Sequence, residues 1–197
     1  MRRTSPIRAD PEVGCIVVTG AERGFCAGGD VTAMNAPAAA PATFENRVDR
    51  QRAGHRLSGL LYAIPKVTLA AINGAAAGAG LGIALACDLR IASDRAKLTT
   101  AFAKVGLGGD FGITWPLTRL LGEAKAKELL FLSDVLTAQD AHAVGLELAG
   151  DRHIRLTDGD LRFTRAENDI ILEYRLESAT QSAPRTLTIC GTRFHVT

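Results

Sequence analysis

Three glycine-rich segments hold the groups of this chain that could do chemistry. They are Phe25-Cys-Ala-Gly-Gly-Asp30, Gly78-Ala-Gly-Leu-Gly82 and Val105-Gly-Leu-Gly-Gly-Asp-Phe-Gly112. Gly28 and Gly29 permit positive φ and a close approach of the backbone to a ligand, so the N–H groups of the first turn could bind an anion or an oxyanion. The structural alternative is a tight turn capped by Asp30.

The second segment follows an apolar run at 67–72 and opens a helix. The first turn of a helix presents N–H groups without helical partners and the positive end of the helix dipole. The spacing is not GxGxxG, and no basic residue follows as in a phosphate loop, so a nucleotide site is not predicted. Close packing of helix on sheet by small residues is an equally good interpretation.

Asp110, in the third segment, lies between glycine-rich turns and apolar neighbours. A partly desolvated carboxylate suits a general base or a proton shuttle. The alternative is an N-cap for a helix that starts near residues 112–116, and spacing alone favours this cap. His55 is expected to be a surface or hydrogen-bonded residue of a helix, and Trp115 to lie in the core or in a pocket wall.

The elements that must position these segments alternate between strands and helices. Apolar runs predict buried strands at 14–19, 67–72 and 89–92. A helix over 44–62, with Val48, Leu57, Leu60 and Leu61 on one side, is ended by Pro65. Further helices are expected at 81–87, 116–121, 124–132 and 138–144, with breaks at Gly122 and Ser133. This alternation favours an α/β architecture.

Composition excludes several classes of protein. Of 197 residues, 47% are apolar and 22% charged, which is typical of a soluble globular chain rather than a disordered one. The net charge is +2 and aromatics make up 5%, so neither nucleic acid nor an anionic membrane is an expected partner. The cysteines, Cys15, Cys26, Cys87 and Cys190, stand far apart, which predicts no metal site and reduced thiols in a cytoplasmic protein.

The stretch 67–87 is uncharged and long enough to span a bilayer. It contains the turn signal Asn73-Gly74, and many of its apolar residues are alanine, which drives insertion weakly. A buried strand, a turn and a close-packed helix are therefore the better prediction.

The sequence changes character near Gly150. Residues 151–197 contain arginine but no lysine, although lysine occurs at 66, 97, 104, 125 and 127. Residues 170–174 could form a strand, but no partner for it is visible in the sequence. We expect a core domain at 10–148 and an atypical, weakly folded tail at 149–197. A change of reading frame near Gly150 is a hypothesis that sequencing the encoding DNA tests.

Together, and in this order, the motifs resemble the crotonase (enoyl-CoA hydratase/isomerase) superfamily. The matching stretches are 17–30, 65–80, 85–92 and 102–110, within about 10–148. The resemblance implies a crotonase-like β/α spiral (ClpP/crotonase fold), truncated at the N-terminus, atypical at the C-terminus and assembled as a homo-trimer or hexamer. It also implies an acyl-CoA thioester substrate and no cofactor beyond the coenzyme A of that substrate.

By position, the resemblance assigns an oxyanion hole to the amides of Gly29 and Ala79. Glutamates typical of hydratases are replaced by Gly82 and Phe102, so hydration by two glutamates is not supported. Asp110 aligns with the aspartate of some isomerases, which implies a proton shuttle between C2 and C4 of an enoyl thioester. Expected substrate contacts are Ala27, Gly28, Asp30, Val31, Gly78, Phe102 and Val105. An inactive acyl-CoA-binding remnant, a hydratase and a carboxylate-nucleophile hydrolase remain as alternatives.

Overall fold

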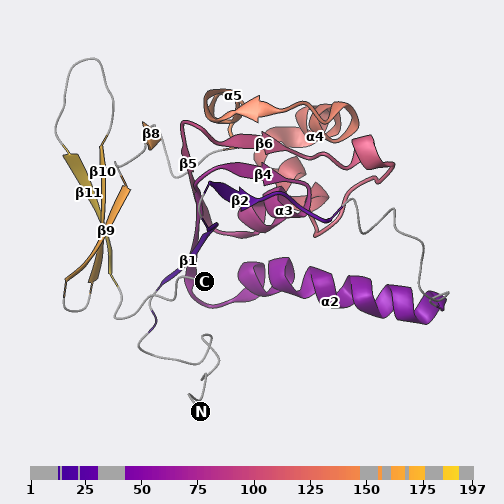
Figure 1. Ribbon diagram of the computed structural model, residues 1–197, viewed down its shortest axis with the longest axis horizontal. Helices are drawn as coiled ribbons and strands as arrows, with labels where there is room; N and C mark the ends of the chain where they lie inside the picture. The colour runs from indigo at the N-terminus through magenta and orange to yellow at the C-terminus, as the bar shows by residue number, and fades with distance from the viewer. Residues whose placement is uncertain are drawn as a thin grey trace, which may run out of the picture.

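The computed structural model describes residues 13, 15–21, 23–30 and 43–146, together with the backbone of four strands between residues 155 and 190. Two sheets of four strands and the helices packed on them form the body of the described chain (Figure 1). The first sheet has the order β1 (Cys15–Thr19), β3 (Val67–Ile72), β5 (Leu89–Ser93) and β8 (Arg155–Leu156), and all its pairs are parallel.

The second sheet has the order β2 (Gly24–Cys26), β4 (Ala75–Ala77), β6 (Lys97–Thr99) and β7 (Leu136–Thr137). Its first three strands are parallel, and β7 is antiparallel to β6. From β1 to β6, successive strands therefore alternate between the sheets, and each pair of strands makes one turn of a spiral. These strands were not predicted, because runs of two or three residues are too short to show an alternation of apolar and polar residues.

Asn73 holds two corners of the spiral together. The Gly20 amide donates to Asn73 Oδ1 at 3.1 Å, and Asn73 Nδ2 donates to the Gly20 carbonyl at 3.0 Å. The backbones meet closely here, since a Cβ added at Gly74 would lie 1.9 Å from the carbonyl oxygen of Arg23. A side chain at residue 74 would separate the corners, so this position requires glycine.

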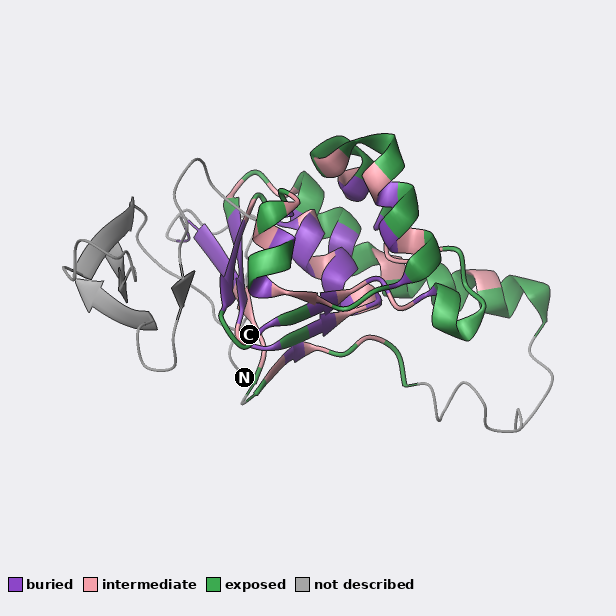
Figure 2. Cartoon of the chain, turned by 90° about the horizontal axis from the view of Figure 1, so that it is seen from above, coloured by how far each residue is buried: buried purple, intermediate pink, exposed green. Residues whose placement is uncertain are grey.

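The helices are α2 (Phe44–Ala63), α3 (Ala79–Ala86), α4 (Thr114–Leu132) and α5 (Ala138–Ala143), with a short 3-10 turn, η2 (Ala103–Val105). The predicted end of α2 before Pro65 is confirmed, and so is the break at Gly122, where φ is 75°. The central helix α3 is largely buried, whereas α2 is mostly exposed (Figure 2). The stretch 67–87 is strand, strand and helix, and no helix of the described part is long and apolar enough to cross a membrane.

The apolar side predicted for α2 is only partly buried, and Trp115 is more exposed than a core residue. Leu57 and Leu60 are 48% and 53% exposed, because α2 contacts the body of the chain mainly through Ser58 and Leu61. Trp115 is also 48% exposed, so it is not a core residue. Its ring stacks edge-on against Tyr62 on the outer surface.

The strand expected near residues 170–174 exists as β10 (Asp169–Arg175), and the prediction that it lacks a partner is wrong. It pairs on both sides, with β9 (Leu161–Ala166) and with β11 (Pro184–Cys190), in antiparallel register. The partners escaped prediction because Arg and Thr interrupt their apolar residues.

The thiols give a test of burial. Burial raises the pKa of Cys15 to about 11 and that of Cys87 to about 12, whereas Cys26 is only partly buried. At pH 8, below both raised values, only about one in a thousand Cys15 thiols is a thiolate, which is the reactive form. In a Cys190→Ser variant we expect a thiol reagent to modify Cys26 first, and the two buried thiols only after denaturant is added. Equal native rates for all three would contradict this burial.

Candidate active site

The first turn of α3 is the centre of the site. Gly78 precedes the helix with φ 55° and ψ −118°, a conformation that favours glycine, and its amide donates to the Thr99 carbonyl at 3.1 Å. Ala79 is the first helical residue, so its N–H has no acceptor within the helix. A backbone donor is therefore presented at the start of a buried helix.

The first glycine-rich loop lies against this turn. Gly28 has φ 90°, and a Cβ built on it would lie 2.8 Å from the Ala77 carbonyl oxygen and 3.6 Å from the Ala79 amide nitrogen. The structure thus brings Gly28, and with it the next residue Gly29, to the N-terminal end of α3. Gly29 itself does not have positive φ. Ala27, Gly29 and Asp30 are exposed, and Val31 lies outside the described residues.

The backbone of Asp110 approaches α3 at Gly82, the fourth residue of the helix. A Cβ built on Gly82 would lie 3.7 Å from the Asp110 carbonyl oxygen and 3.1 Å from the Phe111 Cβ. One carboxylate oxygen of Asp110 accepts from the Phe111 amide at 2.8 Å and also pairs with His55 Nε2. The Asp110 side chain is 24% exposed and that of His55 37%, so the pair is partly shielded from water.

The expectation that Asp110 caps the following helix through its side chain is wrong. Helix α4 begins at Thr114, its N-cap position is Ile113, and no side chain caps it. Asp110 contributes its backbone carbonyl instead, which accepts from the Ile113 amide at 3.1 Å. The carboxylate is directed to His55 rather than to α4.

His55 is the residue of this site that sequence reasoning missed. It is 55 residues from Asp110, on a helix whose neighbouring residues are mostly exposed. Nothing in the local pattern distinguishes it from a surface histidine. Its pairing depends on where α2 lies relative to the 108–112 loop, which only the three-dimensional structure provides.

The two positions that carry glutamates in typical hydratases have no acid group here. Gly82 leaves no room for a side chain unless Phe111 moves, because the built Cβ is already 3.1 Å from Phe111. Phe102 is 6% exposed, and its ring atoms come within 3.8 Å of a Cβ built on Gly78. Val105, at the end of η2, is 44% exposed. Asp110 is an acidic residue whose main chain approaches α3, at Gly82.

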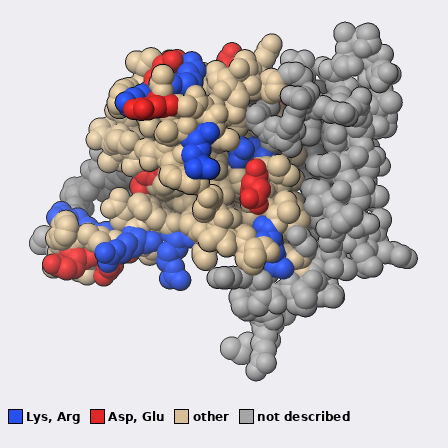
Figure 3. Space-filling view, turned by 180° about the vertical axis from the view of Figure 1, so that it is seen from behind, with Lys and Arg blue, Asp and Glu red and all other residues tan. Residues whose placement is uncertain are grey.

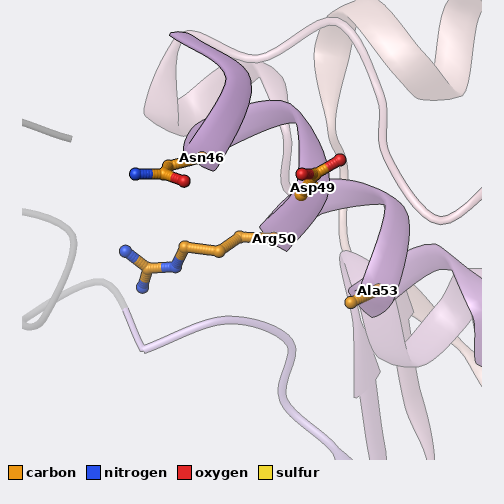
Figure 4. A pocket seen from close by; sticks show the side chains of 4 residues that line it. All are labelled: Asn46, Asp49, Arg50 and Ala53. Carbon is orange, nitrogen blue, oxygen red and sulfur yellow. The ribbon is translucent and has the colours of Figure 1, made fainter. Parts of the chain in front are cut away.

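Charge on the surface gathers on α2. Four exposed arginines, Arg47, Arg50, Arg52 and Arg56, outnumber the two acids of the helix, and basic side chains line it in the lower left of Figure 3. A hollow lined by Asn46, Asp49, Arg50 and Ala53 lies on the same helix (Figure 4). It contains no residue of the glycine-rich segments. Among the described residues, no group of three or more His, Cys, Asp or Glu could hold a metal ion.

The geometry agrees with comparisons to known proteins. A family model described as Enoyl-CoA hydratase/isomerase matches residues 5–149, and the chain therefore belongs to this family. The fold is that of the crotonase enzymes. A solved enoyl-CoA hydratase from Polaromonas sp. JS666 aligns with a TM-score of 0.65 and 36% identity, over 71% of this chain and 54% of that one.

Two curated relatives differ in their named activities. The 1,2-epoxyphenylacetyl-CoA isomerase of Escherichia coli K12 is 40% identical over 140 residues, 71% of this chain and 53% of the relative. The crotonyl-CoA hydratase of Syntrophomonas wolfei is 35% identical over 141 residues, 71% of this chain and 52% of the relative. The chain spans about half the length of these relatives.

Proposed function

We propose that the chain binds an acyl-CoA thioester and moves a proton within it, as an enoyl-CoA isomerase does. One observation supports the proposal: Gly28 approaches Ala79, and the backbone of Asp110 approaches Gly82, both within the first turn of α3. Two of these segments offer backbone donors and the third offers a base. The proposal puts the thioester carbonyl at the two donors and its neighbouring carbon at the Asp110 carboxylate.

The proposed reaction is a shift of a carbon–carbon double bond. The Asp110 carboxylate removes a proton from C2 of a 3-enoyl thioester. The electrons of that C–H bond form a double bond between C1 and C2, and the carbonyl π electrons move onto the thioester oxygen. The amides of Gly29 and Ala79 stabilise the oxyanion of the resulting dienolate. Asp110 then returns the proton at C4 as the thioester carbonyl re-forms, which leaves the double bond between C2 and C3.

Substrate binding is assigned to residues of the glycine-rich segments and their neighbours. We assign contacts with the acyl group to Phe102, Val105 and Gly78, and contacts with the thioester end of coenzyme A to Ala27, Gly28, Asp30 and Val31. The arginines of α2 offer positive charge for phosphate groups of coenzyme A.

Assembly as a homo-trimer or hexamer is part of the proposal, because apolar side chains of α2 and α4 are exposed and large exposed apolar patches mark interfaces. Light scattering that finds a monomer would contradict the assembly.

The direct test mixes the purified full chain with a panel of 3-enoyl-CoA and 2-enoyl-CoA esters. We expect double-bond migration, detected by chromatography, and a rise in melting temperature with the esters that react. Binding without conversion would identify an inactive acyl-CoA-binding protein, and water addition would identify a hydratase. Either result would overturn the isomerase proposal.

Ala79→Pro tests the backbone donor. Proline removes the N–H, yet it is well tolerated at the first position of a helix because its φ is already helical. Loss of one oxyanion donor should lower kcat by about 10²–10³-fold. Ala79→Gly, which keeps the N–H, is the matched control and should retain most of the activity. A proline variant that melts like the wild type and is fully active would remove Ala79 from the oxyanion hole.

A second candidate is hydrolysis through a covalent intermediate on Asp110, and the neighbouring His55 is the observation that favours it. A carboxylate nucleophile with a base within hydrogen-bond reach is a typical arrangement for covalent catalysis. Asp110 would attack the thioester carbon and expel the coenzyme A thiolate, which gives an anhydride, or attack an aryl carbon and expel its leaving group, which gives an ester. His55 would take a proton from the water that hydrolyses this intermediate. Mass spectrometry of the protein quenched during turnover would detect the covalent adduct on Asp110, whereas isomerisation forms none.

A further inference from the structure

We propose that Phe111 is a positioning residue, which holds Asp110 and His55 together against the first turn of α3. The inference rests on the proposed function only in assigning proton transfer to Asp110. The contacts that support it are observed within the chain and do not depend on the proposed function. They come from the backbone of Phe111, from its side chain and from the two glycines that it faces.

The backbone of Phe111 adopts a conformation that bulky residues rarely take. Its φ is 50°, in the left-handed region, where the Cβ of a large side chain is crowded. Glycines with positive φ flank the segment, Gly109 at 139° and Gly112 at 70°. In this conformation the Phe111 amide donates to the Asp110 carboxylate at 2.8 Å. The strained residue thus fixes one oxygen of the carboxylate.

The side chain of Phe111 reaches two helices. On α3, its Cβ is 3.1 Å from a Cβ built on Gly82; on α2, its Cζ is 3.7 Å from a Cβ built on Gly54. A Cβ at Gly82 would crowd Phe111, whereas one at Gly54 would be in ordinary contact with the ring, so the phenyl group lies between the two helices. Its ring also contacts that of His55, with centroids 5.4 Å apart and planes inclined at 57°.

These contacts explain how His55 and Asp110, which are 55 residues apart in the sequence, are held next to each other. Helix α2 buries only Ser58 and Leu61, so it has few other contacts that could fix the position of His55. The ring of Phe111 fills the gap between α2 and α3 beside His55, while its amide holds Asp110. Without the ring, the side chains of His55 and Asp110 should remain but no longer be correctly placed relative to each other.

The test compares Phe111→Ala with Phe111→Tyr, which keeps an aromatic ring. We expect the alanine variant to lose at least about tenfold in kcat with KM nearly unchanged, because small misplacements of a catalytic group are costly. The tyrosine variant should restore most of kcat. Should the alanine variant fail to fold, Phe111→Gly gives the same comparison, because glycine accepts positive φ without strain.

A second readout does not depend on activity. The imidazole nitrogens of His55, observed by ¹⁵N NMR at one pH, should shift in Phe111→Ala toward their positions in Asp110→Asn, and stay near wild type in Phe111→Tyr. A His55 signal unchanged in Phe111→Ala would overturn the positioning role. If the wild-type chain isomerises nothing, the proposed function fails while the NMR comparison still decides the role of Phe111.

Discussion

Asp110→Asn should lower kcat for enoyl-thioester isomerisation by about 10²–10⁴-fold, the usual contribution of a positioned acid or base. The amide is almost the same size as the carboxylate, and its oxygen can still accept from the Phe111 amide. It cannot take up the proton that the reaction moves. The change therefore removes the chemistry while it leaves the packing around the turn in place, and kcat with the reactive ester measures it.

Asp134→Asn is the matched control, because Asp134 is an exposed carboxylate outside the three glycine-rich segments. We expect this control to be as active as the wild type, and both variants to bind the coenzyme A ester with similar melting-temperature shifts. An Asp110→Asn protein that isomerises at the wild-type rate would remove Asp110 from the reaction.

Gly80→Ala should destabilise the fold, although alanine is the better helix former. Gly80 is the second residue of α3, and a Cβ there would lie 2.0 Å from the carbonyl oxygen of Cys26 and 2.7 Å from its Cβ. The obstructing atoms include backbone of β2, which cannot rotate away as a flexible side chain would. Overpacking typically costs about 1–3 kcal/mol, and this contact is tight enough to reach or exceed the upper value. Denaturant unfolding measures the loss.

Gly59→Ala supplies the contrast within the same chain. Gly59 is an exposed helical residue of α2, and a Cβ there would meet nothing within 4 Å. Only the helix propensity changes, so we expect stabilisation by about 0.5–1 kcal/mol. Two glycine-to-alanine changes in helices should thus have opposite signs. If Gly80→Ala were also stabilising, the close contact between α3 and β2 would be wrong.

The longer elements could be predicted because their signals are local. The apolar run 67–72 coincides with β3, and Pro65 and Gly122 mark real interruptions. The three-residue strands of the second sheet are defined by pairing with distant segments, so their own residues carry little information. For the same reason the exposure of Trp115 could not be predicted, since it depends on which surface of the chain α4 presents.

The candidate site was only partly visible in the sequence. Spacing identified the three turns and Asp110, but on spacing alone the helix cap was favoured, and the resemblance to a family supplied the oxyanion and acid–base roles. The structure adds the approach of Gly28 to Ala79 and the pairing of His55 with Asp110. Both arise where segments about fifty residues apart meet, which no local pattern encodes.

The alternation of strands between two sheets also sets the order in which the chain can fold. Thr19 of β1 pairs with Ala71 of β3, and Gly20 is held by Asn73, so the first strand has to wait for partners more than fifty residues further along the chain. Contacts so distant in sequence slow folding, because the loop between them must close before any of them forms. During synthesis, β1 therefore leaves the ribosome well before its neighbour exists. Until β3 is synthesised, the apolar residues of β1 can form non-native contacts.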